Sequence, residues 1–273
     1  MMHKENDLRF EFGENWKNYV KGLDDKKIAT AVESVVSLLG TDSLAGKTFI
    51  DIGSGSGLFS LAAHILGAEV FSFDYDINSV EATQSVKEKY ANTSLEWTVT
   101  QGSILDEKFI TELGTFDYVY SWGVLHHTGD MYSALNNASK LVNDNGSLTV
   151  AIYNTQTFTP AWKLIKKFYV SSPRLVQVLM NIGYTFYFSS GLLIADLLRF
   201  RNPLKRYTNR TRGMNLYYDV VDWIGGYPFE TATPEEIFSY YYKKGFELTK
   251  LITVAGKMGC NEFTFFKRSA KES

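Results

Sequence analysis

The chain has 273 residues, which is enough for one large domain or for one domain with a sizeable insertion. Its residues are 45% hydrophobic and 15% aromatic, so a full core can form. The net charge of −2 supplies no global attraction to nucleic acid, and we expect no nucleic-acid partner. A single cysteine, Cys260, excludes an intrachain disulfide and a cysteine-rich zinc site. The four histidines show no metal-ligand spacing, so we predict no metal.

The N-terminal part of the chain predicts two helices. Residues 1–13 are polar and contain no apolar signal core, so we expect a cytoplasmic protein. A helical pattern begins at 15–20, and residues 25–39 predict a second helix that ends at Gly40. We therefore predict that residues 1–45 form an N-terminal helical cap.

From residue 46 onward, predicted strands and helices alternate, which is typical of a doubly wound parallel sheet. The predicted strands cover 47–52, 69–73, 95–100, 116–121 and 147–153, and the predicted helices cover 57–66, 78–90 and 130–142. In such sheets, ligands bind beyond the carboxyl ends of the strands, where the strand order reverses. The chemically distinctive residues of this region all lie at those ends.

This alternation is interrupted between residues 154 and 232. Thr233, Pro234 and Glu236 then predict a capped helix start. Two strands are predicted after that helix, at 246–254 and 262–267. The predicted fold is thus an α/β domain of 46–153 and 233–273 with a mostly parallel seven-stranded sheet and an antiparallel last strand. Residues 154–232 form a helical insertion after the fifth strand.

A glycine-rich turn follows the first predicted strand. Gly53, Gly55 and Gly57 let the backbone approach a ligand closely, and the next helix directs unpaired N–H groups at that ligand. Asp51 places a carboxylate immediately before the turn. A phosphate-binding loop rarely has an anion there, whereas a cationic ligand is favoured by one.

The stretch from Thr48 to Ser60 resembles the first motif of class I S-adenosylmethionine-dependent methyltransferases. About twenty residues past the turn, Asp74 can accept hydrogen bonds from both ribose hydroxyls of a nucleoside cofactor. A nicotinamide dinucleotide is the alternative, but its G-x-G-x-x-G spacing differs, and Asp51 would repel a pyrophosphate. The resemblance implies that S-adenosylmethionine is bound here, and it assigns this role to Asp51, Gly53, Ser54, Gly55, Gly57, Asp74 and Tyr75.

Two later segments extend the resemblance, which covers roughly 45–153 and 233–268. Ser103 and Ile104 follow the third strand, where related enzymes surround the adenine, although many of them have an acid in place of Ser103. The fourth strand ends in Ser121 and Trp122, and the following Gly-Val-Leu-His-His loop is very like that of class I enzymes acting on small molecules. In resembling enzymes a leading aromatic segment folds over the cofactor, which implies this role for Trp16 and Tyr19.

The two histidines of that loop are the candidates for catalysis. Methyl transfer is an in-line substitution in which the acceptor must be aligned and, where protonated, deprotonated. His126 and His127 lie where the acceptor should arrive, and we favour His127 as the group that accepts a proton or orients the acceptor. The alternative is a histidine that holds the loop by hydrogen bonds.

Class I enzymes set acceptor choice with segments added to a common sheet, so we expect 154–232 to select the substrate. Aromatic side chains stack on sugars or enclose cations, and carboxylates hold amines or hydroxyls. The candidate substrate-binding residues are Arg212, Tyr217, Tyr218, Asp219, Asp222, Trp223, Tyr227 and Glu230. The expected acceptor is a small or medium-sized saccharide, nucleotide sugar or natural product methylated at O or N. A packed aromatic loop with surface acids is the alternative.

The insertion also raises the question of a membrane. Residues 175–195 contain no charged residue, but Gln177 and Asn181 interrupt them, and we predict helices covering the site or an oligomer contact, not a membrane span. Six cations follow within 199–212. Peripheral membrane contact through 164–212, with a lipid-linked acceptor, therefore stays open. A third alternative is a catalytically silent adenosyl-binding module that works with a partner.

Overall fold

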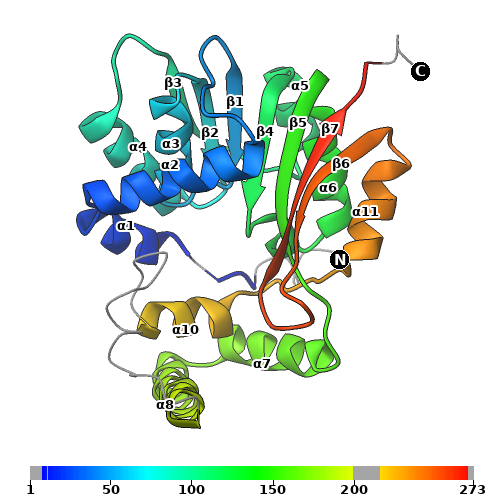
Figure 1. Ribbon diagram of the computed structural model, residues 1–273. Helices are drawn as coiled ribbons and strands as arrows, with labels where there is room; N and C mark the ends of the chain where they lie inside the picture. The colour runs from blue at the N-terminus through cyan, green and yellow to red at the C-terminus, as the bar shows by residue number, and fades with distance from the viewer. Residues whose placement is uncertain (1–7, 11, 199–215, 270–273) are drawn as a thin grey trace. The chain divides into compact units, whose positions relative to one another are not determined.

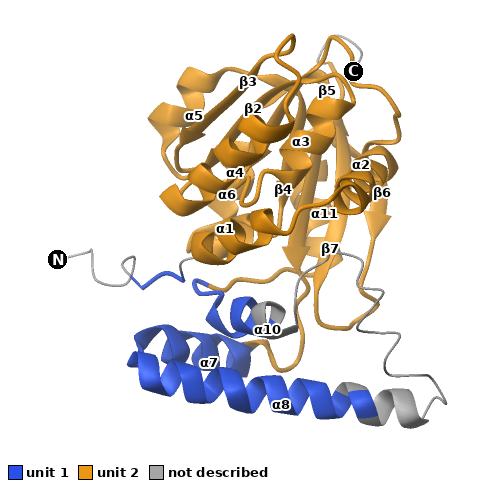
Figure 2. Cartoon of the chain, turned by 90° about the vertical axis from the view of Figure 1, so that its left-hand side faces the viewer, with its two compact units in different colours: residues 1–10, 160–228 blue, residues 11–159, 229–273 orange. Residues whose placement is uncertain are grey.

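A computed structural model of the chain describes residues 8–10, 12–198 and 216–269 (Figure 1). The chain separates into two compact units, which Figure 2 colours blue and orange. Unit 1 consists of residues 1–10 and 160–228, and unit 2 consists of residues 11–159 and 229–273. The division into 1–45, 46–153 with 233–273, and 154–232 stays a prediction.

Unit 2 contains a seven-stranded sheet with the strand order β3-β2-β1-β4-β5-β7-β6. β1 lies between β2 and β4 and is parallel to both, whereas β7 is antiparallel to β5 and β6. The mostly parallel sheet with an antiparallel last strand is therefore confirmed. The strands are β1 (Thr48–Ile52), β2 (Glu69–Asp74), β3 (Trp97–Gln101), β4 (Phe116–Trp122), β5 (Val142–Tyr153), β6 (Phe246–Ile252) and β7 (Cys260–Lys267). The order reverses at β1 and β4, so their carboxyl ends are where such a sheet binds ligands.

Helices cover both faces of this sheet (Figure 1). They are α1 (Gly13–Lys21), α2 (Asp25–Leu39), α3 (Leu58–Ile65), α4 (Ile77–Tyr90), α5 (Glu107–Leu113), the short 3₁₀ helix η1 (Leu125–His127), α6 (Met131–Lys140) and α11 (Pro234–Tyr242). Two apolar clusters result. One cluster joins β1 and β2 to α2 and α3, and the other joins β4, β5 and β7 to α6 and α11. The sheet is therefore buried on both faces, as its parallel strands require.

Local signals place most of these helices correctly. Thr233 accepts from the Glu236 N–H while the Glu236 side chain accepts from the Thr233 N–H, which confirms the predicted capping box. Gly40 ends α2 in the left-handed conformation, as expected. The prediction missed α5, which has only seven residues and begins after Asp106, whose side chain accepts from the N–H groups of Lys108 and Phe109.

The ends of the segment between β5 and α11 are joined where they meet unit 2. Asn154 and Ala232 form a parallel bridge, and the Ala232 N–H donates to the Tyr153 carbonyl at 3.0 Å. The hydroxyls of Thr155 and Thr231 lie 2.9 Å apart. The chain therefore leaves and re-enters unit 2 at adjacent positions.

Unit 1 is built from α8 (Arg174–Leu198), α10 (Leu216–Gly225) and most of α7 (Thr159–Ser171). Tyr169, Val220 and Ile224 form its buried centre. The Lys166 ammonium is also buried, donates to the Trp223 carbonyl and lies 4.3 Å from the centre of the Trp223 ring. Burial lowers the pKa of Lys166 to about 7. In the described ranges, no helix is long and apolar enough to cross a membrane.

Candidate active site

The glycine turn after β1 is enclosed by three other segments. Gly53, Gly55 and Gly57 have positive φ angles of 75°, 55° and 73°. A Cβ added at Gly53 would lie 2.5 Å from Val124, and one added at Gly57 would lie 2.8 Å from the Cα of Thr83. Conformation and space therefore both demand glycine at these positions.

Asp51 lies at the end of a chain of buried hydrogen bonds. The Ser60 hydroxyl donates to the Asp51 carboxylate at 2.6 Å, and Ser72 donates to Ser60 at 2.8 Å. The Trp97 indole N–H donates to Ser72 at 2.9 Å. Burial raises the pKa of Asp51 to about 7, against the lowering effect of the Ser60 hydrogen bond. Ser60, Ser72 and Trp97 lie on three different elements, so no local sequence pattern predicts that they form this chain.

Asp74 connects the end of β2 to the glycine turn. One of its carboxylate oxygens accepts from the Gly55 N–H at 3.0 Å, and the other accepts from the Asp76 N–H at 2.9 Å. Burial raises the pKa of the Asp74 carboxyl to about 6. Tyr75, which follows it, is 58% exposed. The Ser54 hydroxyl lies 2.9 Å from that of Thr83 and so links the same turn to α4.

Helix α1 places an aromatic side chain on the glycine turn. A Cβ added at Gly55 would lie 3.1 Å from the Trp16 indole nitrogen. The helix is held on α4 by the Gly13 N–H, which donates to the Asp76 carboxylate at 2.8 Å, and by the Lys17 ammonium, which donates to Asn78 at 2.8 Å. Tyr19 packs edge-on against Trp16 with ring centres 5.9 Å apart. Trp16 therefore lies directly on the glycine turn, whereas Tyr19 contacts Trp16. The predicted role of both residues in covering the cofactor stays a prediction.

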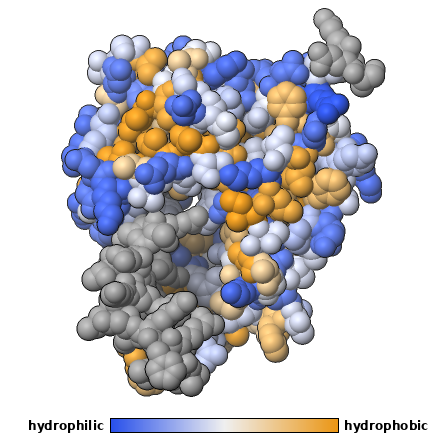
Figure 3. All heavy atoms as spheres, in the orientation of Figure 1, coloured by the Kyte–Doolittle hydropathy of each residue, from blue (hydrophilic) through white to orange (hydrophobic). Residues whose placement is uncertain are grey.

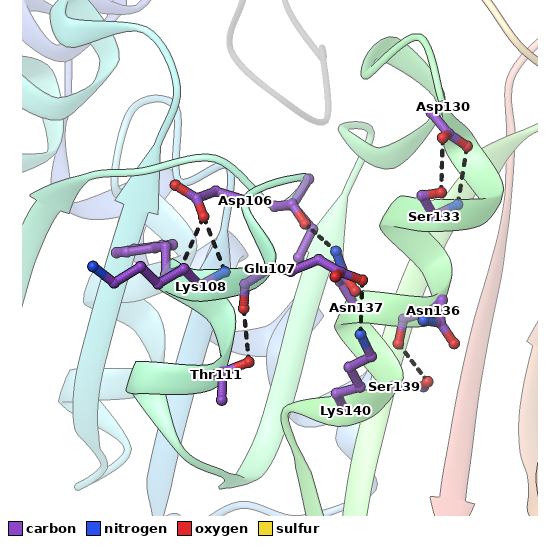
Figure 4. A network of polar contacts seen from close by, with 12 residues as sticks. Asp106, Glu107, Lys108, Thr111, Asp130, Ser133, Asn136, Asn137, Ser139 and Lys140 are labelled. Atoms are coloured by element: carbon purple, nitrogen blue, oxygen red, sulfur yellow. Dashed lines mark hydrogen bonds and ion pairs between the residues drawn. The ribbon is translucent and has the colours of Figure 1, made fainter.

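Helix α6 fixes the loop that follows β3. The Asn137 side chain donates to the Ile104 carbonyl at 2.8 Å, and Ile104 itself is 5% exposed. Figure 4 shows Asn137 on α6 within a network of polar contacts. The Ser103 hydroxyl accepts from the Leu105 N–H at 3.2 Å. Asn137 was not predicted, because its partner lies thirty-three residues away. Ser103 and Ile104 therefore lie in a loop of defined shape.

The last two side chains of β4 bind to different strands of the sheet. The Ser121 hydroxyl is buried and donates to the Ile52 carbonyl at 3.1 Å, which joins β4 to β1 beside the glycine turn. The Trp122 indole N–H donates to Glu262 on β7 at 3.2 Å. Ser121 therefore shares the edge with the turn, while the Trp122 indole is bound on the opposite side of β4 from β1.

An aromatic cluster surrounds the two histidines. His126 is fully buried, its carbonyl accepts from the Glu230 N–H at 3.0 Å, and its ring centre lies 4.1 Å from that of Tyr153. His127 is half-buried, with its ring centre 5.2 Å from Phe12 and 5.4 Å from Tyr153. Tyr153 and Phe12 were not predicted to lie beside the histidines. Tyr153 could have been found from its place at the carboxyl end of the fifth strand.

The predicted substrate-binding residues are divided between the units. Glu230 belongs to unit 2, where its carboxylate accepts from the Met131 N–H at 3.0 Å. Asp222, Trp223 and Tyr227 belong to unit 1. Trp223 packs edge-on against Trp162 with ring centres 5.4 Å apart, and Tyr227 is 9% exposed, so both contribute to packing there. The side chains of Tyr217, Tyr218 and Asp219, and all of Arg212, lie outside the described residues.

Comparison with known proteins agrees with this geometry. Residues 50–148 match the family model described as "Methyltransferase domain". Over these residues the chain is similar to S-adenosylmethionine-dependent methyltransferases of class I. The matched residues run from β1 through the glycine turn and the histidine loop into β5.

The methyltransferase domain has distant curated relatives. It is 28% identical to a ubiquinone biosynthesis O-methyltransferase of Glaesserella parasuis over 115 aligned residues. The alignment covers 42% of this chain and 48% of that protein. The domain is 32% identical over 107 residues to a ribosomal protein L11 methyltransferase of Streptococcus uberis, covering 39% of this chain and 31% of that protein. The chain thus spans less than half the length of these relatives.

Solved structures extend the likeness to nearly the whole chain. A magnesium protoporphyrin IX methyltransferase from Synechocystis, solved with bound SAH, has a TM-score of 0.54 at 16% identity, covering 96% of this chain and 98% of that chain. A Haloferax volcanii methyltransferase in complex with its activator also has a TM-score of 0.54, at 12% identity over 96% and 98% of the two chains. At these identities the likeness shows that the fold is shared.

Proposed function

We propose that the protein transfers the methyl group of S-adenosylmethionine to an oxygen or nitrogen atom of a small or medium-sized acceptor. A saccharide, a nucleotide sugar and a natural product are the acceptor classes that we consider. One observation carries the proposal. The Gly55 N–H binds Asp74 and Gly53 packs on Val124, so the turn, the β2 carboxylate and the histidine loop form one edge.

The residues of this edge fit the cofactor. Gly53, Gly55 and Gly57 carry no Cβ atoms that would keep a ligand away from the backbone of the turn, and the two carboxylates beside it differ in role. Asp74 can accept from the ribose hydroxyls, while Asp51 favours the cationic amino acid end through its charge. We assign the adenine contact to Ile104 and the cover of the turn to Trp16, whose indole lies close to Gly55. The bound cofactor supplies an electrophilic methyl group.

His127 is the better candidate for the acceptor side. Complete burial of His126 and the hydrogen bond to its carbonyl give that residue a part in holding the loop. His127 is only half-buried and is held between Phe12 and Tyr153. A ring nitrogen of its imidazole can take a proton from a hydroxyl or ammonium group of the acceptor.

Calorimetry with S-adenosylmethionine and with NAD tests the cofactor part of the proposal. We expect binding of the first and none of the second, and the reverse result would overturn the proposal. Formation of S-adenosylhomocysteine with a panel of saccharides, nucleotide sugars and phenolic or amine acceptors tests the activity. Cofactor binding without turnover on any acceptor in that panel would instead favour a silent adenosyl-binding module.

A further inference from the structure

Helix α8 has two apolar faces. Met180, Tyr184 and Phe188 lie on one face and pack in unit 1, where Trp162 contacts the last two with ring centres 6.1 Å and 6.5 Å away. The opposite face is exposed, although it is just as apolar. Its large side chains recur at helical spacing, and they are Leu175, Val178, Leu179, Ile182, Phe186 and Leu193.

The exposure on this face is high for side chains of this kind. Leu175 is 72% exposed and Phe186 is 75% exposed. On helix α7, Leu164 and Phe168 are also exposed, at 70% and 60%. Of the nineteen exposed large hydrophobic residues in the described part of the chain, nine lie on α7 and α8. Hydrophobic side chains also gather in patches between hydrophilic ones on the face of the molecule seen in Figure 3. Concentrated apolar exposure of this kind marks an interaction surface.

The charges of this segment are mostly of one sign. Residues 154–198 contain three lysines, one arginine and a single acidic residue, Asp196, in a chain whose net charge is −2. Lys163 is exposed next to Leu164, and Arg174 is exposed next to Leu175. The chain from Leu175 to Ala195 has no charged side chain and, as helix, extends for about 30 Å. Exposed apolar side chains with cations at their border are typical of helices that lie in a lipid interface.

From these observations we infer that the exposed faces of α7 and α8 bind an anionic lipid surface, with α8 lying in the plane of the interface. The apolar stripe enters the boundary between headgroups and acyl chains, and Lys163 and Arg174 contact anionic headgroups. Charge favours lipid over a second copy of the chain, because self-association would bring together two surfaces on which cations outnumber acidic residues. The inference is independent of the methyl-transfer activity.

Flotation with vesicles tests this inference on the full chain without cofactor. The probes are vesicles of phosphatidylcholine alone and of phosphatidylcholine with about a third phosphatidylglycerol. We expect binding to the anionic vesicles that is at least about tenfold stronger than to the neutral ones, because each basic residue near an anionic surface adds several-fold in affinity. We expect binding to weaken as salt rises.

Two double variants separate this surface from other exposed side chains. Ile182→Glu with Phe186→Glu places charges on the stripe at positions four apart. Phe238→Glu with Tyr242→Glu does the same on α11 in unit 2, where the two rings are exposed and stacked. Both proteins should keep the melting temperature of the wild type to within a few degrees, because all four side chains are exposed.

The first double variant should lose vesicle binding by about tenfold or more, and the second should keep it. Absence of wild-type binding to anionic vesicles would overturn the inference, as would equal binding by the two double variants. A wild-type dimer in sedimentation velocity that the first variant dissociates, with no vesicle binding, would assign the surface to self-association instead. Loss of methyl transfer with vesicle binding intact would affect only the proposed function.

Discussion

We expect the Asp51 carboxyl to couple cofactor binding to pH. Burial raises its pKa in the folded protein to about 7, whereas an unfolded chain has a value near 3.9. Between these pH values the folded state holds a proton that the unfolded state has lost. The contribution of the Asp51 carboxyl to the stability of the folded state is therefore fully present below about pH 4 and is lost as the pH rises through about 7. A cationic ligand favours the opposite, ionised form of Asp51.

We predict that affinity for S-adenosylmethionine increases by up to about tenfold between pH 6 and pH 8, with release of a proton on binding. Calorimetry in two buffers of different ionisation enthalpy measures both quantities. Asp51→Asn should bind more weakly and flatten this dependence. Asp74→Asn serves as the comparison. The Asp74 carboxyl has a pKa of about 6, so any change in cofactor affinity that depends on its ionisation occurs at lower pH. A dependence that survives in Asp51→Asn would assign it to another group.

For His127 we predict a separation of turnover from binding. His127→Ala should reduce turnover by about a hundredfold or more, the usual size of a general acid–base contribution, with cofactor affinity nearly unchanged. Tyr153→Phe keeps the ring that contacts His127 and should retain most of the activity if Tyr153 acts by packing. Full activity in His127→Ala would remove this histidine from the mechanism.

At the scale of elements, the glycine turn can be tested against a glycine with nearly the same backbone. Gly57 and Gly40 have φ angles of 73° and 72°, but a Cβ at Gly57 would meet the Thr83 backbone, while a Cβ at Gly40 would meet nothing within 4 Å. Gly40→Ala should therefore cost only about 1 kcal/mol, from conformation alone. Gly57→Ala should cost more and should also weaken cofactor binding.

Urea denaturation and calorimetry of the two variants measure these effects. Equal losses of stability, with cofactor affinity unchanged in both, would show that the contact with Thr83 is relieved by a small movement of α4. In that case the turn would tolerate a Cβ, and its close packing would have no functional meaning.

The elements that the sequence predicted well are those with local signals. Gly53, Gly55 and Gly57 are spaced along a few residues, and Thr233 caps a helix through a residue three positions away. Features that depend on distant partners were missed. Ser60 acquires its role only because β2 and β3 bring Ser72 and Trp97 to it. No local pattern could reveal that chain of hydrogen bonds.

At the scale of the whole molecule, the joined ends at Asn154 and Ala232 make the intervening segment separable. We predict that replacing 160–228 by a short flexible linker leaves cofactor binding close to that of the full chain. Methyl transfer to the natural acceptor should be lost if 154–232 selects that acceptor. Calorimetry and a transfer assay check the two parts. Transfer that persists would place acceptor recognition in unit 2.

The antiparallel pairing of β5 with β7 has a consequence for how the protein is made. Thr149 on β5 and Thr264 on β7 lie side by side although they are 115 residues apart in the chain. While the ribosome is still translating the residues between them, β5 can pair with β4 but has no neighbour on its other side. A nascent chain with an unsatisfied apolar strand edge is prone to pair with other chains. Completion of the sheet therefore waits for the last strand to leave the exit tunnel, and the cell must protect this edge until then.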